Sequence, residues 1–423
     1  MLWVFLAVLF GAILIGVPVS FSLGLAAVVM VFIMDVNPAI VVEQAVRGVN
    51  SFPLLAVPFF ILVGEIMSRG GIARRLVELA QALVGFISGG LGQVNVAASM
   101  FFGGISGSAV ADTSAIGGMM IPAMKQQRYT GELATSITVS SAVIGILIPP
   151  SIPMILYGIV TQTSISRLFI GGLLPGILVG LVLMLTTFLV ARKHHAGQTQ
   201  RFSFRVLGTA LRRASLGLLL PVIIVGGILG GMFTATEAAV IAAFYSLFIS
   251  LFIYRELKPR DLLQIAISTA RLTGMVLYLL AMAMIVAWLL TTALVPQQLV
   301  QAAGELSTNP YVILGIMCVL LVAVGVVMDL TPAILILAPI MTPIVVAVGV
   351  DPVYFGVLMS FVLGVGLATP PVGTVLYVGC AVGGVRMERL VRSMVPFYAA
   401  LVVVLILMLS FPQTVLWLPS LLG

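Results

Sequence analysis

Long apolar stretches, separated by short polar or charged segments, run along nearly the whole chain. Most of them have the ~20 residues, or slightly fewer, that a helix needs to cross the hydrocarbon core of a bilayer. The pattern therefore predicts an all-α polytopic membrane protein with ten crossing helices, at residues 2–16, 19–34, 53–68, 134–163, 168–191, 214–231, 236–254, 273–295, 354–383 and 394–418.

Two further apolar stretches, residues 91–124 and 312–346, have polar residues in their middle. The first begins and ends near basic residues, and the second lies between segments that are poor in Lys and Arg. A stretch whose two ends lie on the same side must enter and turn back, so we predict two re-entrant helical hairpins from opposite faces. Residues 72–86 separate apolar from charged side chains at helical spacing, which predicts an interfacial helix.

The composition excludes a soluble globular domain, because 61% of the residues are hydrophobic and only 8% are charged. It also excludes a disordered or nucleic-acid-binding chain, since the net charge of +7 comes from short basic loops. Residues 192–213 carry the largest basic cluster and no acidic residue. Positive charge marks the cytoplasmic side, so we place this segment inside and both termini outside.

The two halves of the chain resemble each other at fixed offsets. A shift of 217 pairs Asp112 with Asp329, and a shift of 221 pairs Pro149-Pro150 with Pro370-Pro371. Each half thus has an aspartate-containing hairpin followed by a helix broken at Pro-Pro, and the charges give the halves opposite orientations. Inverted repeats with discontinuous helices are typical of secondary transporters, whose site lies at the repeat interface.

Oxygen-bearing and helix-breaking residues gather in the hairpins and the breaks. Half-helix ends expose backbone carbonyls and amides, and successive prolines free the carbonyls of the preceding turn. A hard cation such as Na⁺ prefers such oxygen ligands, whereas an intramembrane carboxylate is costly and usually functional. The alternatives are tight packing of small residues, helix capping and simple kinks. The candidates are Ser106, Gly107, Ser108, Asp112 and Thr113 in the first hairpin, Pro149, Pro150 and Ser151 in the first break, Asp329 and Thr331 in the second hairpin, and Thr369, Pro370, Gly373 and Thr374 in the second break.

Catalytic interpretations find less support in the sequence. Residues 104–107 match the short G-x-S-G string of intramembrane serine proteases, but the histidine that those enzymes need in the membrane is missing. The two aspartates lack the G-x-G-D signature of intramembrane aspartyl proteases, and no nucleotide or haem motif is present. We therefore expect a transporter with no catalytic residues and no bound organic cofactor, with an intramembrane protease as a remote alternative.

The motifs S-G-S-A-V-A-D-T at 106–113, I-P-P-S-I-P at 148–153, M-D-L-T-P at 328–332 and T-P-P-V-G at 369–373 resemble one known family. It is the large membrane subunit of the tripartite ATP-independent periplasmic (TRAP) transporters. The resemblance implies an ion-transporter-superfamily fold, an elevator-like motion and Na⁺-coupled uptake of an organic acid in the bacterial inner membrane. It also implies two partners, a small four-helix membrane subunit and a soluble periplasmic binding protein.

With that resemblance, roles can be assigned to the candidates. We expect one Na⁺ site at the first hairpin tip and first break (Ser106, Gly107, Ser108, Asp112, Pro149, Pro150, Ser151). A symmetry-related site would use Asp329, Thr331, Thr369, Pro370 and Gly373, and the substrate would contact Ser108, Thr113, Thr369 and Thr374. A stand-alone Na⁺- or H⁺-coupled carboxylate transporter remains the alternative.

The same assignment divides the chain into five parts. They are a scaffold with an interfacial arm (1–90), one transport half (91–191), a cytoplasmic linker (192–213), a second scaffold part (214–311) and the second transport half (312–423).

Overall fold

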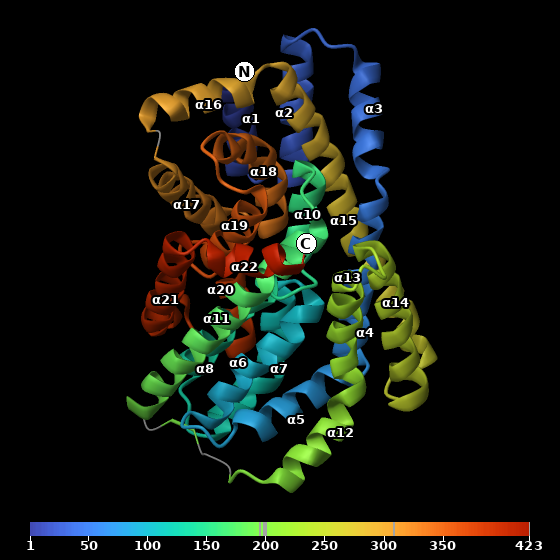
Figure 1. Cartoon of the computed structure of the whole chain (residues 1–423), viewed down its shortest axis with the longest axis vertical. Coiled ribbons are helices and arrows are strands. Elements are labelled where there is room, and N and C mark those ends of the chain that lie inside the picture. The colour runs from blue at the N-terminus through green and yellow to red at the C-terminus, as the bar shows by residue number, and fades with distance from the viewer. Residues whose placement is uncertain (194–195, 198–200, 308, 423) are drawn as a thin grey trace.

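The computed structural model describes residues 1–193, 196–197, 201–307 and 309–422, without the side chains of 104–106 and 422. Every regular element within these ranges is helical. The helices form a central body, which holds both hairpins, and a set of outer helices along one side and at both ends of it (Figure 1).

The outer helices come from both halves of the chain. α15 packs against α2, α3 and α4, and α4 also packs against α14. Their bounds are α1 Leu2–Leu14, α2 Val19–Ile33, α3 Pro38–Val49, η1 Phe52–Leu55, α4 Ala56–Arg69, α12 Phe204–Pro221, η2 Val222–Gly226, α13 Gly227–Leu229, α14 Ala235–Phe248, η3 Ile249–Ile253, α15 Pro259–Thr292 and α16 Val295–Leu306.

The central body interleaves the two halves, because α20 packs on α7, α21 on α8 and α18 on α10. The amphipathic helix α5, Ile72–Val84, connects α4 to the body and confirms the helix expected at 72–86. The body helices are α6 Gly90–Ser106, α7 Ala109–Gln126, α8 Gly131–Ala142, α9 Ile144–Leu147, α10 Ile152–Thr161, α11 Ile165–Lys193, α17 Pro310–Val327, α18 Leu330–Ala347, α19 Pro352–Leu367, α20 Thr374–Gly383, α21 Met387–Ser410 and α22 Gln413–Leu422.

Eight helices of the described chain are long and apolar enough to cross a membrane, or nine if α8–α10 is one broken span. The helices expected at 2–16 and 19–34 are present as α1 and α2, and the broken helix expected at 354–383 is present as α19 and α20 on either side of the Pro-Pro break. All of them are shorter than that length limit, so the count of ten crossings stays a prediction. The single helix expected at 394–418 is wrong: α21 ends at Ser410, and α22 starts only at Gln413, beyond Pro412. Two apolar stretches, 91–124 and 312–346, each form a pair of helices joined by a short turn, α6–α7 and α17–α18.

The helix bounds repeat at an almost constant offset of 221 residues. α6 and α17 end at Ser106 and Val327, α7 and α18 end at Gln126 and Ala347, and both pairs differ by 221. The same register relates α5 to α16, an amphipathic helix that the sequence pattern did not predict.

This register corrects the pairing of the two aspartates. Asp329 is the N-cap of α18, and its counterpart is Ser108, the N-cap of α7. Asp112 lies within the first turn of α7, where the second half has Ala333. The offset of 217 therefore matches two residue types that occupy different places in the fold.

The centre of the body is formed by two helices that are buried almost all round. All positions of α8 from Leu133 to Ala142 are buried, and so are those of α19 from Val353 to Leu367. Such helices do not need a continuous apolar sequence, because the α8 hydroxyls bond back along their own helix: Ser136 donates to Glu132 O at 2.8 Å and Ser140 to Ser136 O at 2.8 Å.

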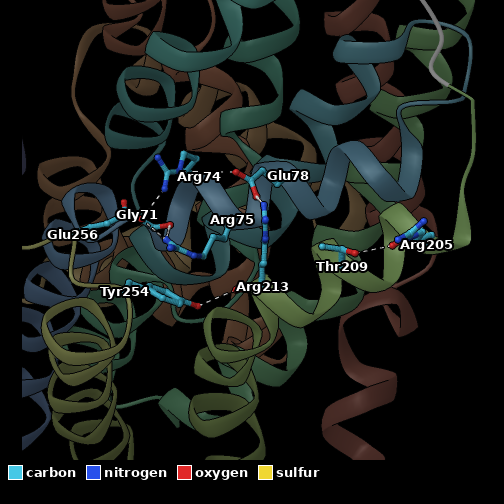
Figure 2. A network of polar contacts seen from close by, with 9 residues as sticks. All are labelled: Gly71, Arg74, Arg75, Glu78, Arg205, Thr209, Arg213, Tyr254 and Glu256. Atoms are coloured by element: carbon cyan, nitrogen blue, oxygen red, sulfur yellow. Dashed lines mark hydrogen bonds and ion pairs between the residues drawn. The ribbon is translucent and has the colours of Figure 1, made fainter.

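The start of α5 is fastened to the outer helices by a polar cluster (Figure 2). Arg74 and Arg75 both donate to Glu256 Oε1 at 2.7 Å, and the Arg75 guanidinium carbon lies 3.6 Å from the centre of the Tyr254 ring. Gly71 precedes α5 at a φ of 75°, and a Cβ there would lie 2.0 Å from Glu256 Oε2. A side chain at this position would strain the backbone and displace the Glu256 carboxylate from the cluster.

Candidate functional site

The tip of the first hairpin contacts the first Pro-Pro break. Gly107 ends α6 at a φ of 59°, and a Cβ on it would lie 2.9 Å from Ile152 N and 3.1 Å from Pro150 O. Only glycine lets the two backbones approach this closely. On either side of the contact, Ser108 caps α7 by accepting from Ala111 N, and Ser151 caps α10 while donating to Ile146 O at 2.6 Å. The expected partnership of first tip and first break is therefore present in space.

Asp112 points into the body beside this contact. The residue is 1% exposed, and a Cβ on Gly145 would lie 2.2 Å from Asp112 Oδ2. A Cβ on Gly103 would lie 3.5 Å from the same oxygen and 2.4 Å from Gly145 Cα. Two glycines, one on α6 and one on α9, thus leave the room that the carboxylate occupies.

The second tip meets the second break in a related way. Gly373 N donates to Val326 O at 3.0 Å, and Thr374 Oγ1 donates to Asp329 Oδ1 at 3.5 Å. Gly373 has a φ of 47°, and a Cβ there would lie 2.7 Å from Thr369 O. The Thr369 hydroxyl itself donates to Val365 O at 2.7 Å. We call the contact between a hairpin tip and its Pro-Pro break a junction. Carbonyl and hydroxyl oxygens gather at both junctions.

Each hairpin also crosses its broken helix at a pair of glycines. A Cβ on Gly145 would lie 2.9 Å from Gly103 Cα, and a Cβ on Gly366 would lie 2.8 Å from Gly325 Cα. The crossing repeats at 221–222 residues, but only the first has an aspartate carboxylate beside it. The two crossings therefore share a backbone plan, but the aspartate of each half lies in a different place: Asp112 beside the glycine crossing, and Asp329 at the hairpin tip.

A cavity of about 840 Å³ separates the hairpin tips from the outer helices. Helices α7 and α18 turn their N-terminal ends toward it, and α4 and α15 form its opposite wall. None of the residues that line it in the described chain is basic. Its polar side chains include Ser108, Ser114, Asp329, Thr331, Glu65 and Ser68.

The residues predicted from sequence divide between the cavity and the junctions. Gly107, Ser108, Asp329 and Thr331 line the cavity. The other described candidates lie outside its lining: Asp112, Thr113, Pro149, Pro150, Ser151, Thr369, Pro370, Gly373 and Thr374. Thr113 is fully buried, so it does not reach the cavity where a substrate contact was expected. The side chain of Ser106 lies outside the described set.

Sequence reasoning missed the polar residues that α4 contributes. Glu65 and Ser68 line the cavity, and Glu65 lies 3.5 Å from Arg69 on the same helix. They come from an apolar stretch that the sequence assigned only to crossing the membrane. The sequence does show that Ile61, Glu65 and Ser68 share one face of a helix. It does not indicate which other element that face contacts.

A buried polar column on α6 and α8 was also missed. Asn95 donates to Thr138 Oγ1 at 2.6 Å, and Ser99 donates to Ser141 Oγ at 2.9 Å. Asn95, Ser99 and Gly103 are spaced four residues apart on α6, so the column points along one helix face toward Asp112. That spacing was the available signal.

Comparisons with known proteins identify the family of this chain. The family described as "Tripartite ATP-independent periplasmic transporter, DctM component" matches residues 6–414. The chain belongs to it. The TRAP family is named for a tripartite system, so the large permease is one of several subunits. Together with the apolar helices, membership identifies a multi-pass protein of the inner membrane.

Two relatives and one solved structure illustrate the likeness. The chain is 39% identical over 414 residues to the 2,3-diketo-L-gulonate TRAP transporter large permease protein YiaN of Escherichia coli, covering 98% of this chain and 97% of the relative. It is 38% identical to the sialic acid TRAP transporter large permease protein SiaM of Vibrio cholerae, covering 97% and 96%. The crystal structure of the Alcanivorax borkumensis YdaH transporter shares the fold, with a TM-score of 0.59, 14% identity and coverage of 83% and 84%.

The local structure also explains a polar sequence at the start of α14. In F-T-A-T-E-A at 233–238, Thr234 caps α14 by accepting from Glu237 N, while Glu237 Oε2 accepts from Thr234 N at 2.8 Å. This is a capping box, and it sets the start of α14. The motif therefore has a structural role in the outer helices, on the side of the molecule away from the hairpin junctions.

Proposed function

We propose that this chain is the substrate-translocating subunit of a Na⁺-coupled TRAP transporter for an organic acid. The observation that carries the proposal is the cavity bounded by both hairpin tips on one wall and by α4 and α15 on the other. A substrate bound there touches both halves of the repeat and the outer helices together. That is the place where alternating access requires a site.

The chemistry of the cavity favours a small anion held by backbone amides. The N-terminal turns of α7 and α18 both face the cavity, and helix N-termini attract carboxylates. Since no Lys or Arg lines the described wall, recognition of the anion rests on these amides and on hydroxyls such as Ser108 and Thr331. A relative named for 2,3-diketo-L-gulonate and another named for sialic acid support an organic acid as the substrate class.

Na⁺ would bind beside the cavity at the two tip–break junctions. The carbonyl of Pro150 near Gly107 and the carbonyl of Thr369 near Gly373 are suitable oxygens, and Asp112 and Asp329 supply negative charge close to them. In this scheme Na⁺ fixes each hairpin tip against its break and so orders the α7 and α18 termini for the substrate. Na⁺ and substrate then bind cooperatively because both stabilise the same arrangement.

Transport would proceed by an elevator motion of the central body against the outer helices. A small membrane subunit would pack on the outer helices, and a periplasmic binding protein would deliver the acid. The relative named as a DctMQ permease of Oleidesulfovibrio alaskensis, of which this chain covers 65%, supports a small partner that is fused in that protein. We propose transport, and not catalysis, as the activity.

Uptake by reconstituted protein tests the function. The chain, its small membrane subunit and its binding protein are placed in proteoliposomes, and accumulation of radiolabelled organic acids is measured with an inward Na⁺ gradient and no ATP. Accumulation is expected with Na⁺ and should fail in choline at constant pH. Equal accumulation in choline would refute Na⁺ coupling. Full uptake without the binding protein would instead favour the stand-alone carboxylate transporter.

A further inference from the structure

The basic segment between the two halves has a surface that the transport site does not use. The N-terminal turns of α12 lie at the lower end of the molecule, below α5 (Figure 1), and Arg201 and Phe202 precede them in the sequence. We propose that this segment, residues 201–213, binds the anionic phospholipid headgroups of the cytoplasmic leaflet. The proposal concerns a membrane surface and is independent of the substrate and the coupling ion.

One face of α12 is already occupied. Ala210, Ala214 and Gly217 are buried, and a Cβ on Gly217 would lie 3.0 Å from Ile72 on α5. The segment is held in this position by polar contacts as well: Tyr254 donates to the Arg213 carbonyl at 3.2 Å, and Arg213 lies 3.9 Å from Glu78 (Figure 2). The remaining faces of the helix are therefore presented in a fixed orientation.

The free faces carry one apolar row and one cationic row. Phe204, 80% exposed, and Leu211 are seven residues apart, as are Arg205 and Arg212. Seven residues make about two helical turns, so each pair forms a row, and the rows lie side by side. Within the described residues Arg205 and Arg212 form no ion pair, in contrast to Arg213. An apolar row beside unpaired arginines is typical of a helix at a membrane interface.

An aromatic cluster extends the apolar row. The ring centroids of Phe86 and Phe202 lie 5.2 Å apart, and those of Phe202 and Phe204 lie 4.8 Å apart. All three rings belong to exposed residues. Aromatic side chains collect at the headgroup level, where an apolar ring can enter the bilayer boundary while the neighbouring chain stays wet.

Length places the segment at that boundary. The candidate span Phe204–Leu229 has 26 residues and is therefore about 39 Å long along its axis, against a hydrocarbon core of ~30 Å. The excess of about 9 Å corresponds to about six residues, or somewhat less than two turns. At the N-terminal end these are residues 204–209, which carry Phe204 and Arg205, and Arg212 follows one turn further along the helix. Charge selects the occupant: residues 192–213 contain six arginines and lysines and no acid, so the fitting surface is anionic lipid.

The geometry gives a direct test by fluorescence quenching. In a chain whose three native tryptophans, Trp3, Trp288 and Trp417, are changed to Phe, a reporter indole is introduced by Phe204→Trp. The protein is placed in bilayers that contain brominated phosphatidylglycerol or brominated phosphatidylcholine at equal mole fraction. The F204W indole should be quenched more strongly by the anionic lipid than by phosphatidylcholine.

Removing the cationic row should abolish the lipid preference. R205Q/R212Q should lower the relative binding constant for the anionic lipid about fivefold for each arginine removed. The matched control, R255Q/R260Q, removes two exposed cytoplasmic charges from another loop and should leave the preference unchanged. Equal quenching of F204W by both lipids, or an equal effect of R255Q/R260Q, would each overturn the proposal.

A second measurement keeps the native tryptophans. The chain is extracted in mild detergent, washed extensively, and its retained phosphatidylglycerol is quantified by mass spectrometry. The unsubstituted chain and R255Q/R260Q should retain more anionic lipid per protein than R205Q/R212Q. Equal retention by all three would overturn the proposal. Neither measurement requires uptake, so its outcome is independent of whether Na⁺ drives transport.

Discussion

The glycine at position 145 offers the sharpest test of the first junction. Gly145→Ala would place a Cβ 2.2 Å from Asp112 Oδ2 and 2.9 Å from Gly103 Cα, well inside van der Waals contact. The α6 backbone cannot move without moving the hairpin tip, so the carboxylate is expected to be displaced. Overpacking of this kind costs about 1–3 kcal/mol. If that cost falls on the Na⁺-bound state, the Na⁺ concentration for half-maximal uptake should rise roughly five- to 150-fold.

The assay is uptake by reconstituted protein as a function of Na⁺ concentration, with folding checked by thermal unfolding in detergent. Gly118→Ala is the matched control, because a Cβ there meets nothing within 4 Å. On helix propensity alone this control should stabilise α7 by up to about 1 kcal/mol. A folded G145A protein with the Na⁺ curve of the unsubstituted chain would refute the link between Asp112 and Na⁺.

Three further predictions use other parts of the structure. Asp112→Asn should retain some uptake at a raised Na⁺ requirement and Asp112→Ala should retain little, in Na⁺ titrations of folded protein; wild-type curves for both would make Asp112 structural. Glu256→Gln should lower the unfolding free energy by about 1–2 kcal/mol, since it removes the carboxylate shared by Arg74 and Arg75, whereas Glu43→Gln, which affects one exposed pair, should have almost no effect. A cysteine introduced by Ser203→Cys, in a chain lacking Cys318 and Cys380, should react with a membrane-impermeant maleimide only after the cytoplasmic side is exposed; labelling of intact spheroplasts would invert the topology.

The sequence predicted the elements whose causes are local. Successive prolines at 149–150 and 370–371 end helices wherever they occur, so both breaks lie where they were expected. The helix–turn–helix units at 91–124 and 312–346 follow from apolar stretches interrupted by glycine, hydroxyl and carboxylate residues. The amphipathic pattern of 72–86 likewise sufficed to predict α5.

What the sequence missed depends on contacts between distant segments. Glu65 lines the cavity because α4 faces segments distant in the sequence, such as those of Ser108 and Asp329, and no local pattern indicates this. Thr113 was expected at the substrate, but one residue of helical rotation separates a buried position from a lining one such as Ser114. α16 escaped detection because its amphipathic pattern lies in a segment of weak hydropathy beside a long apolar helix.

The two halves of the repeat differ in where their aspartate lies, and only the structure shows this difference. Two offsets in the sequence, 217 and 221, fit different motifs equally well, and the helix bounds select 221. In that register the halves share the tip–break contact and the glycine crossing. They do not share the acid, since Asp112 is buried against Gly145, while Asp329 occupies the N-cap position of α18 at the cavity and accepts a hydrogen bond from Thr374. The Asp112 carboxylate is packed against backbone and cannot move with a ligand. The Asp329 carboxylate lies at the edge of the cavity, so its contacts can change when a ligand enters. The inverted repeat therefore supplies two similar backbone frames, and single substitutions within them give the junctions unequal chemistry.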